Sequence, residues 1–226
     1  MAEPFRLRIT FAKTDRLRWL SHLELTRTME RLIRRSGLPY VVTQGFNRHM
    51  RFAVGPALPV GTAGWNEVFD VWLTDYVPPG QALAALQSAA GDTLPIKAVR
   101  YVPGKVKGLQ STHTISRYRL LVDAGGMTGS ALQEALNATI STGQIEVWHK
   151  GKTRVFDLDG VVVRPPEVLP MDPSEGYLSV TCVLRSLERG SIRPEQLMVG
   201  PSSESVRVVA VIRTALEEEQ SSEEEE

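Results

Sequence analysis

The sequence predicts an α+β protein built from two tandem ferredoxin-like units, each a βαββαβ arrangement with an antiparallel sheet. Three observations lead to this prediction. Stretches in which apolar and polar residues alternate are separated by stretches with apolar residues at helical spacing. In the first hundred residues the order of these stretches is strand, helix, strand, strand, helix, strand. After a short segment at 103–108 that is rich in chain breakers, a similar order begins again.

The chain opens on a strand. From Phe5 to Phe11, apolar and polar residues alternate strictly, which is typical of a strand with one side against a core. The polar positions would then line the other side of the strand. The residues expected to face inward are Phe5, Leu7, Ile9 and Phe11.

A helix is predicted over residues 22–36. Ser21 is a good N-cap, and Glu24 follows at the capping-box spacing. Gly37 and then Pro39 should end the helix, since glycine tolerates a left-handed cap and proline cannot continue the helix. Its periodic apolar residues, which should face the core, are Leu25, Met29, Leu32 and Ile33. The arginines on the opposite side are Arg27, Arg31, Arg34 and Arg35.

Three more strands and one helix complete the first half. We take 40–42, a short β-like stretch before a glycine loop, as the second strand and 68–73 as the third. A helix follows Pro79 and ends at Gly91. Its periodic apolar residues are Ala82, Leu83, Leu86 and Ala90. The last strand is expected at 94–102.

The second half repeats the order of elements but not the identity of residues. Its expected strands are 115–122, 145–148, 154–158, 177–184 and 205–213. Its expected helices are 130–141 and a short one at 193–198, where Pro194 stands at the first helical position. The segment 160–166 receives no assignment. The predicted divisions are 1–103 and 114–216 for the two domains, 104–113 for a linker and 217–226 for a disordered acidic tail.

Composition restricts the class of protein. The 226 residues suffice for one large domain or two small ones. No run of about 18 apolar residues is present, and charged residues interrupt every early apolar run, so we expect neither a membrane span nor a signal peptide. The single cysteine, Cys182, excludes an intramolecular disulfide and any all-cysteine metal or iron–sulfur site within one chain. A cytoplasmic location follows as the expectation.

The charge is unevenly distributed. The chain has 26 basic and 26 acidic residues, but 7 of the acidic ones lie in 217–226. Residues 1–55 hold 11 basic and 4 acidic residues, a net charge of +7, whereas 56–216 hold 15 of each. A basic region of this kind is the pattern that polyanions select. The tail could compete with nucleic acid for that region, or serve only to keep the protein soluble.

Motifs for catalysis and metal binding are missing from the sequence. The four histidines have no paired ligand spacing, and there is no phosphate-binding glycine loop followed by Lys-Ser/Thr. Gly125 and Gly126 precede a predicted helix, but such a pair is too common to indicate a site. If the protein is a ribonuclease, His22 and His49 are the candidates for general acid–base catalysis. No metal site is predicted.

The loop from Gln44 to Phe52 interleaves flat rings with cations. Single-stranded RNA is bound by such mixtures, because bases stack on rings while arginine holds phosphate. The candidate nucleic-acid-binding residues are Arg27, Arg31, Arg34, Arg35, Phe46, Arg48, His49 and Arg51. The alternatives remain open at this point: the helical arginines as a solvated face, Phe46 and Phe52 as core residues, and His22 as a helix-start residue packed against the loop. Trp19, Trp65 and Trp72 are interpreted as core residues.

Several strings resemble a known family. The strings are Leu17-Arg-Trp-Leu-Ser-His-Leu-Glu-Leu, Arg34-Arg-Ser-Gly-Leu-Pro-Tyr, Gln44-Gly-Phe-Asn, Pro56-Ala-Leu-Pro-Val-Gly, Gly190-Ser-Ile-Arg-Pro-Glu-Gln-Leu-Met and Ile212-Arg-Thr-Ala-Leu. Together they resemble the radical SAM-linked protein family, domain of unknown function 2344, a bacterial family whose members look like partners of a radical SAM protein. The family's loop usually reads Gly-Phe-Asn-Pro-His-Pro, and here Arg48 and Met50 replace the prolines.

The resemblance implies an association and not a reaction. No three-cysteine cluster motif is present, so an iron–sulfur cluster and S-adenosylmethionine would belong to a partner and no cofactor is expected in this chain. The leading hypothesis is an accessory module of a radical SAM system that binds RNA, such as tRNA or rRNA, or presents a substrate, and is not itself catalytic. The alternatives are an adaptor that docks a radical SAM enzyme without touching RNA, and a small metal-independent ribonuclease.

Overall fold

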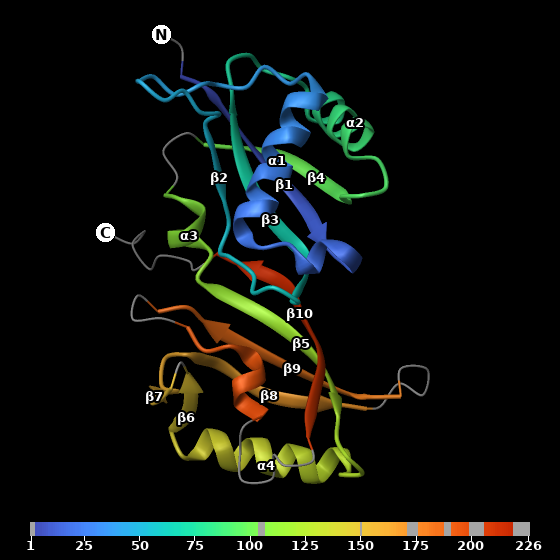
Figure 1. Ribbon diagram of the computed structural model, residues 1–226, viewed down its shortest axis with the longest axis vertical. Helices are drawn as coiled ribbons and strands as arrows, with labels where there is room; N and C mark the ends of the chain where they lie inside the picture. Colours follow the sequence, from blue (N-terminus) through green and yellow to red (C-terminus); the bar gives the residue numbers. More distant parts are fainter. Residues whose placement is uncertain are drawn as a thin grey trace, which may run out of the picture. The chain divides into compact units, whose positions relative to one another are not determined.

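The computed structural model describes residues 3–103, 107–149, 151–170, 176–187, 191–198 and 206–218. The chain divides into two compact units, Met1–His113 (unit 1) and Thr114–Glu226 (unit 2). The fold is a mixture of α and β with few helices, and the strands within each unit pair antiparallel (Figure 1).

In unit 1, four strands pair antiparallel. Strand β1 (Phe5–Lys13) lies between β4 (Ile96–Val102) and β3 (Ala63–Leu73). Strand β2 (Phe52–Val54) pairs with β3 on the side away from β1. In the β1–β3 register, Leu7 is opposite Val71 and Ile9 is opposite Phe69. These side chains form one apolar face of the sheet, and all four are fully buried.

Two helices cover this face. Helix α1 (His22–Ser36) follows a 3₁₀ turn, η1 (Asp15–Trp19), and α2 (Pro79–Ala90) precedes β4. The predicted start and end of α1 are confirmed, because Ser21 and Glu24 form the complete capping box and Gly37 takes a left-handed φ of 70°. The α1 residues in the core are the predicted ones: Leu25, Met29, Leu32 and Ile33.

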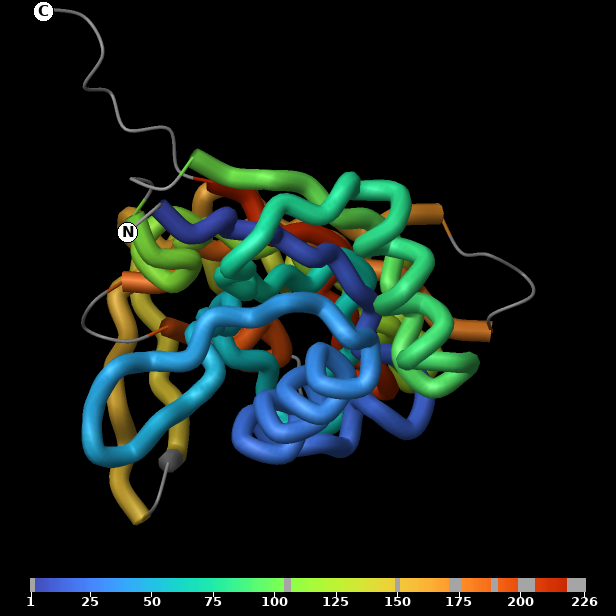
Figure 2. Tube along the Cα trace, turned by 90° about the horizontal axis from the view of Figure 1, so that it is seen from above, coloured from blue at the N-terminus to red at the C-terminus, as the bar shows by residue number. Residues whose placement is uncertain are grey.

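The second strand is not where the sequence suggested. Residues 40–42 make only isolated bridges, Tyr40 with Leu73 and Val42 with Met50, and the paired strand is β2 at Phe52–Val54. The chain instead folds back on itself between these points: the Arg51 amide donates to the Val41 carbonyl (2.7 Å) and the Thr43 amide to the His49 carbonyl (2.7 Å). We call residues 40–51 the arm; it projects as a light-blue loop in Figures 1 and 2.

The polar side of β1 is also buried, which strict alternation did not predict. Arg6 is 3% exposed and Arg8 2%, and both hold Asp70 of β3, which is fully buried. The distances are 2.6 Å from Arg6 Nη2 to Asp70 Oδ2 and 2.9 Å from Arg8 Nε to Asp70 Oδ1. Charged groups can be buried when they are paired and hydrogen-bonded in this way.

Phe5 is a further correction. It was expected in the core, but it lies partly exposed at the start of β1. Its ring makes edge-to-face contacts with Tyr76 and Tyr101, at 5.7 and 6.1 Å between ring centroids. Two tyrosine rings therefore take the place of the core at the first position of the strand.

In unit 2, four strands pair antiparallel in the order β10-β5-β9-β8. The bounds of its strands are Ile115–Asp123 (β5), Val162–Leu169 (β8), Leu178–Arg185 (β9) and Arg207–Glu217 (β10). Helix α4 (Gly129–Ser141) packs on the core through Leu132 and Leu136. The hairpin of β6 (Gln144–His149) and β7 (Lys152–Asp157) stands apart from the larger sheet.

Unit 2 and the segment that precedes it differ from the prediction in four details. The segment 193–198 contains a 3₁₀ turn, η2 (Pro194–Met198), and β8 begins within the unassigned segment. A short helix, α3 (Leu109–Thr112), lies in the segment expected to be a linker. Strand β10 continues to Glu217, whose carboxylate accepts from Arg117 Nε at 3.0 Å, so it enters the segment expected to be an acidic tail. Residues 219–226 of that tail lie outside the described residues.

Within the described ranges, no helix has the length and apolar composition of a membrane-spanning segment.

Candidate nucleic-acid interface

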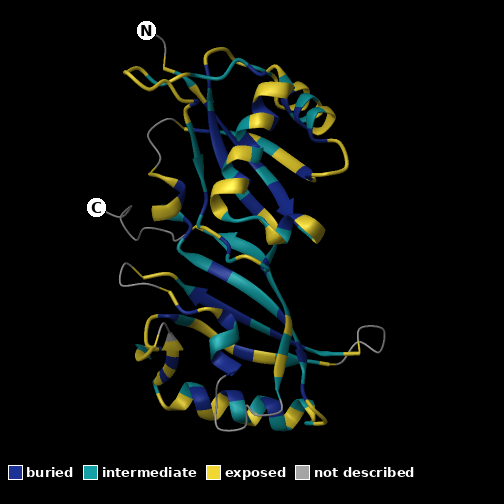
Figure 3. Ribbon diagram, in the orientation of Figure 1, coloured by how far each residue is buried: buried dark blue, intermediate teal, exposed yellow. Residues whose placement is uncertain are grey.

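The predicted arginines of α1 share one exposed face. They lie opposite the buried side of the helix, because steps of three and four residues return to the same face. Figure 3 shows this outward side of α1 as exposed. No carboxylate within the described ranges forms an ion pair with these side chains, which we call the arginine face: Arg27, Arg31, Arg34 and Arg35.

Glu24 is an acidic group on the same side of the helix, one turn before Arg27. Hydrogen bonds from the Ser21 hydroxyl and amide, and to a smaller extent the charge of Arg27, lower the pKa of Glu24 below its ordinary value. The Ser21 amide donates to Glu24 Oε2 at 2.8 Å. The carboxylate is therefore anionic at neutral pH and engaged with the helix cap.

The arm presents the other predicted residues to solvent. Phe46 near its tip is fully exposed, and Arg48 and His49 are exposed beside it. The core interpretation is therefore wrong for Phe46, whereas Phe52 packs partly buried on the core of unit 1. Gly45 has a φ of +136°, which L-residues rarely adopt and which glycine permits at the turn of the arm.

A contact joins the arginine face to the arm. The Arg34 guanidinium lies 5.7 Å from the centre of the Tyr40 ring, and its Nη1 donates to the Tyr40 hydroxyl at 3.3 Å. Tyr40 is the first residue of the arm, and Arg34 lies in the last turn of α1. The structure thus brings two parts of the predicted site together, because the short connection after Gly37 returns the chain to the end of the helix.

Arg51 at the other end of the arm stacks on Trp72 of β3, 4.7 Å from the ring centre. The Arg6 guanidinium lies 5.0 Å from the same ring. Arg51 also borders a cleft of about 950 Å³ whose other walls are Glu3, Pro4, residues 41–44 and Thr74. The sequence indicated Arg51 as a site residue, but it did not indicate the cleft.

The tryptophans were interpreted as core residues, and that is wrong for Trp19. Its side chain is 59% exposed at the end of η1, where the Arg18 guanidinium lies 5.0 Å from its ring. Trp65 is 38% exposed, and Trp72 is partly buried under the two guanidinium groups. The core interpretation is therefore wrong for Trp65 as well. At Trp19 and Trp72 a cationic partner takes the place of an apolar core, which hydrophobicity alone does not predict.

The two histidines proposed for acid–base chemistry are both exposed. His22 is the first residue of α1, where its side chain is exposed. His49 lies on the arm. In the part of the chain that the structure describes, neither imidazole has a hydrogen-bonding partner.

Comparison with known proteins identifies the family to which the chain belongs. The profile of a family described as uncharacterized proteins conserved in bacteria, DUF2344, matches residues 6–194. The chain belongs to this family. The matched range contains the arginine face and the arm of this DUF2344 member. No curated protein matches the chain.

Two solved structures resemble this family member distantly. A chain from the crystal structure of a Cbf5-Nop10-Gar1 complex has 10% identity and a TM-score of 0.47, and the match covers 93% of this chain and 48% of that one. This chain therefore spans about half the length of that protein. An unknown protein from Galdieria sulphuraria has 16% identity and a TM-score of 0.30, with 81% of each chain covered. Neither likeness is close enough to carry an argument.

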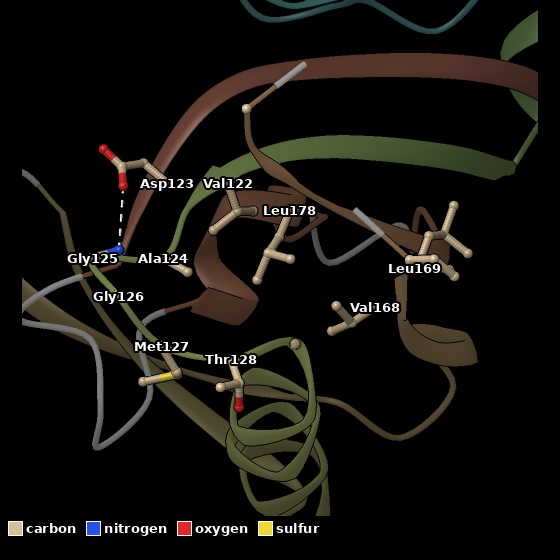
Figure 4. Close-up of a pocket in the computed structure, with 13 residues that line it drawn as sticks. Val122, Asp123, Ala124, Gly125, Gly126, Met127, Thr128, Val168, Leu169 and Leu178 are labelled. Carbon is tan, nitrogen blue, oxygen red and sulfur yellow. Dashed lines mark hydrogen bonds between the residues drawn. The ribbon is translucent and has the colours of Figure 1, made fainter. Parts of the chain in front are cut away.

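This DUF2344 protein also has a pocket of about 620 Å³ in unit 2 (Figure 4). It lies between the loop from β5 to α4 and the facing ends of β8 and β9, with Val122, Val168 and Leu178 among its apolar walls. The Gly125 amide donates to Asp123 Oδ1 at 3.2 Å, which shapes the loop. The sequence indicated only the two glycines of this loop. It did not indicate the pocket, because the other walls come from strands that are distant in the sequence.

The described residues of unit 2 include one cysteine, Cys182, which is buried. Burial, and to a smaller extent the charge of Glu195, raises the pKa of Cys182 to about 12, so its thiol stays protonated within the core. Across the described segments, no group of three or more His, Cys, Asp or Glu side chains is placed to hold a metal ion.

Proposed function

We propose that this protein is a non-catalytic RNA-binding module, and that it contacts RNA through the arginine face of α1 and the arm. One observation carries the proposal: exposed guanidinium groups without carboxylate partners among the described residues run along α1 and join, at Arg34 and Tyr40, an arm with an exposed ring.

Phosphate is the anion that suits the arginine face. A guanidinium presents a planar fork of donors that matches two phosphate oxygens, and a row of such groups can follow a nucleic-acid backbone. Residues 1–55 have a net charge of +7, which would raise the local concentration of a polyanion and the rate of its association. Helix α1 is anchored by its capped start and its buried apolar side, so the row is held on a rigid element.

The arm would add stacking to these electrostatic contacts. A fully exposed phenylalanine is unfavourably hydrated on both faces and makes no contribution to the core. A base stacked on such a ring contributes about 1–3 kcal/mol to binding without reading the sequence. In this proposal, Arg48, two residues from Phe46, contacts the phosphate of a stacked nucleotide.

The module would work together with a radical SAM protein. On the family resemblance, we infer that it acts in the cytoplasm beside a radical SAM protein, which would hold the iron–sulfur cluster and S-adenosylmethionine. In that arrangement this chain presents RNA, such as tRNA or rRNA, and its partner performs the chemistry.

We also infer that both units are ferredoxin-like. The support is the strand order: β4-β1-β3-β2 in unit 1 and β10-β5-β9-β8 in unit 2, in each case the fourth, first, third and second strands of a βαββαβ unit. In unit 2, the β6–β7 hairpin would be an insertion and η2 would replace the second helix. This assignment says nothing about function by itself.

RNA binding tests the proposal. The protein, truncated after Glu218, is titrated into fluorescently labelled tRNA and rRNA fragments while anisotropy is recorded at several salt concentrations. With about six phosphate contacts, the association constant should fall roughly a thousandfold between about 50 and 200 mM salt. Binding that does not respond to salt, or no binding at the lowest salt, would contradict the proposal.

Charge reversal locates the site. The variant with Arg27→Glu, Arg31→Glu and Arg35→Glu should lose RNA binding and keep its melting temperature. The matched control reverses three exposed cations of unit 2 by the same charge: Lys152→Glu, Arg154→Glu and Arg164→Glu. If both variants lose the same affinity, binding depends on net charge and not on the arginine face.

A second function has one observation in its favour. Trp19 and Leu23 expose large apolar side chains near the start of α1, as protein-docking surfaces do. An adaptor that docks a partner protein through them would bind without RNA. Recovery of a radical SAM protein with the tagged chain after nuclease treatment, and its loss in Trp19→Ala, would favour the adaptor.

A further inference from the structure

Arg51, which lines the cleft beside the arm, is held in place by contacts of both its side chain and its main chain. Arg51 stacks on the face of Trp72, and its main chain is held on both sides, by its amide to the Val41 carbonyl at 2.7 Å and by the Trp72 amide to its own carbonyl at 3.1 Å. A guanidinium stacked by its face keeps the N–H groups of its edges available. Within the described ranges, no carboxylate pairs with Arg51.

The ring under Arg51 is itself fixed from the interior. Arg6 lies 5.0 Å from the centre of the Trp72 ring, and its Nε donates to Asp70 Oδ2 at 2.7 Å. A chain of contacts therefore runs from a fully buried carboxylate through Arg6 and Trp72 to Arg51 at the surface. Because the side chain is ordered before any ligand arrives, less conformational entropy is lost when its edge binds an anion.

The other walls of the cleft have the chemistry of a base pocket. Pro4, Val41 and Val42 supply apolar surface for one flat ring. The Gln44 side chain has no partner in the described part of the chain and offers both a donor and an acceptor. Glu3 supplies a carboxylate, which would repel phosphate but accept from the N–H groups of a base. At about 950 Å³, the cleft is in the size range of small-ligand sites.

We propose that this cleft binds one unpaired nucleotide, with its phosphate on Arg51 and its base between Pro4, Val41 and Val42. The inference rests on the proposed RNA-binding function and adds the class of RNA: the preferred ligand has a nucleotide outside a duplex. A base that is stacked and paired cannot enter such a cleft, whereas one in a loop or at an end can.

The experiment compares two RNA hairpins of the same stem, one blunt and one with a three-nucleotide unpaired 3′ extension. The full-length protein is tested beside Arg51→Lys, which keeps the charge but loses the fork, and beside the control Arg154→Lys on β7. The wild type should bind the extended hairpin about tenfold or more tightly than the blunt one. Arg51→Lys should lose that preference, whereas its salt dependence should stay unchanged because lysine keeps the positive charge. Arg154→Lys should behave as the wild type.

A second titration separates failure of the cleft from failure of the proposed function. The four nucleoside 5′-monophosphates are titrated calorimetrically into the wild type and Arg51→Lys. Saturable binding that Arg51→Lys weakens about tenfold supports the cleft even if neither hairpin binds, a result that overturns the RNA-binding function alone. Equal wild-type affinity for the two hairpins, a preference that survives in Arg51→Lys, or no saturable binding of any nucleotide overturns the cleft assignment.

Discussion

The buried arrangement of Arg6, Arg8 and Asp70 provides the sharpest test of the structure. Asp70→Asn removes the negative charge and leaves two guanidinium groups in a site where none of the three residues is more than 3% exposed. The Asp70 oxygens lie 2.6 to 3.2 Å from donors of both arginines, so each contact loses the negative charge of its acceptor, and the contacts to the oxygen that is replaced by an amide nitrogen are lost.

The expected cost is large. Breaking a buried ion pair by removing one partner lowers the free energy of unfolding by about 3–5 kcal/mol, and we expect about 3 kcal/mol because asparagine still accepts one hydrogen bond. For a unit of this size, that corresponds to a decrease in melting temperature of about 10 °C or more. The control is Asp92→Asn on an exposed residue, which should change the free energy by less than about 0.5 kcal/mol.

The measurement is urea unfolding followed by tryptophan fluorescence, with a calorimetric melt on the same samples. Since Trp72 lies against Arg6, its emission should report the loss of this arrangement. A variant that unfolds at the same urea concentration as the Asp92→Asn control would refute the reasoning, because it would show that the two arginines do not depend on the carboxylate.

Three further predictions concern the surface. Phe46→Ala should leave the melting temperature unchanged and weaken single-stranded RNA binding about five- to a hundredfold, measured by anisotropy; unchanged affinity would remove the ring from the site. Because the pKa of Glu24 is lowered in the folded protein, its capping contribution is present above the ordinary value of 4.5 and is lost as the pH falls through the lowered pKa. In urea titrations, the difference in stability between wild type and Glu24→Gln should therefore be constant above about pH 5 and shrink below it. A constant difference down to about pH 2 would contradict this. The double variant His22→Ala, His49→Ala should leave any RNA cleavage in the preparation unchanged on a denaturing gel, and a loss of cleavage would favour the ribonuclease hypothesis.

Helix α1 shows how much local sequence can determine. Its first and last residues, its cap and its buried side were all predictable, because the Ser21–Glu24 box, the Gly37 turn and the apolar periodicity involve residues at most four positions apart. The exposure of the arginine face follows from the same periodicity, since a helix with one buried side must expose the other.

The position of the second strand in unit 1 was not predictable from local sequence. Apolar alternation located β1 and β3. Residues 40–42 and Phe52–Val54 are equally short and apolar, but it is Phe52–Val54 that pairs with β3 as a strand. The choice is a tertiary one, because a strand is defined by the neighbour to which it hydrogen-bonds.

By itself, the sequence determined the class of fold, helix α1 with its cationic side, and the concentration of positive charge in residues 1–55. Only the tertiary structure decided that Arg6 and Arg8 are buried, that Phe46 is in solvent, and that Arg51 rests on Trp72 beside a cleft. The physical reason is the range of the interactions. Caps and periodicity act within one or two turns of a helix, whereas Asp70 lies more than sixty residues from Arg6 and comes within reach of it only when β1 and β3 pair.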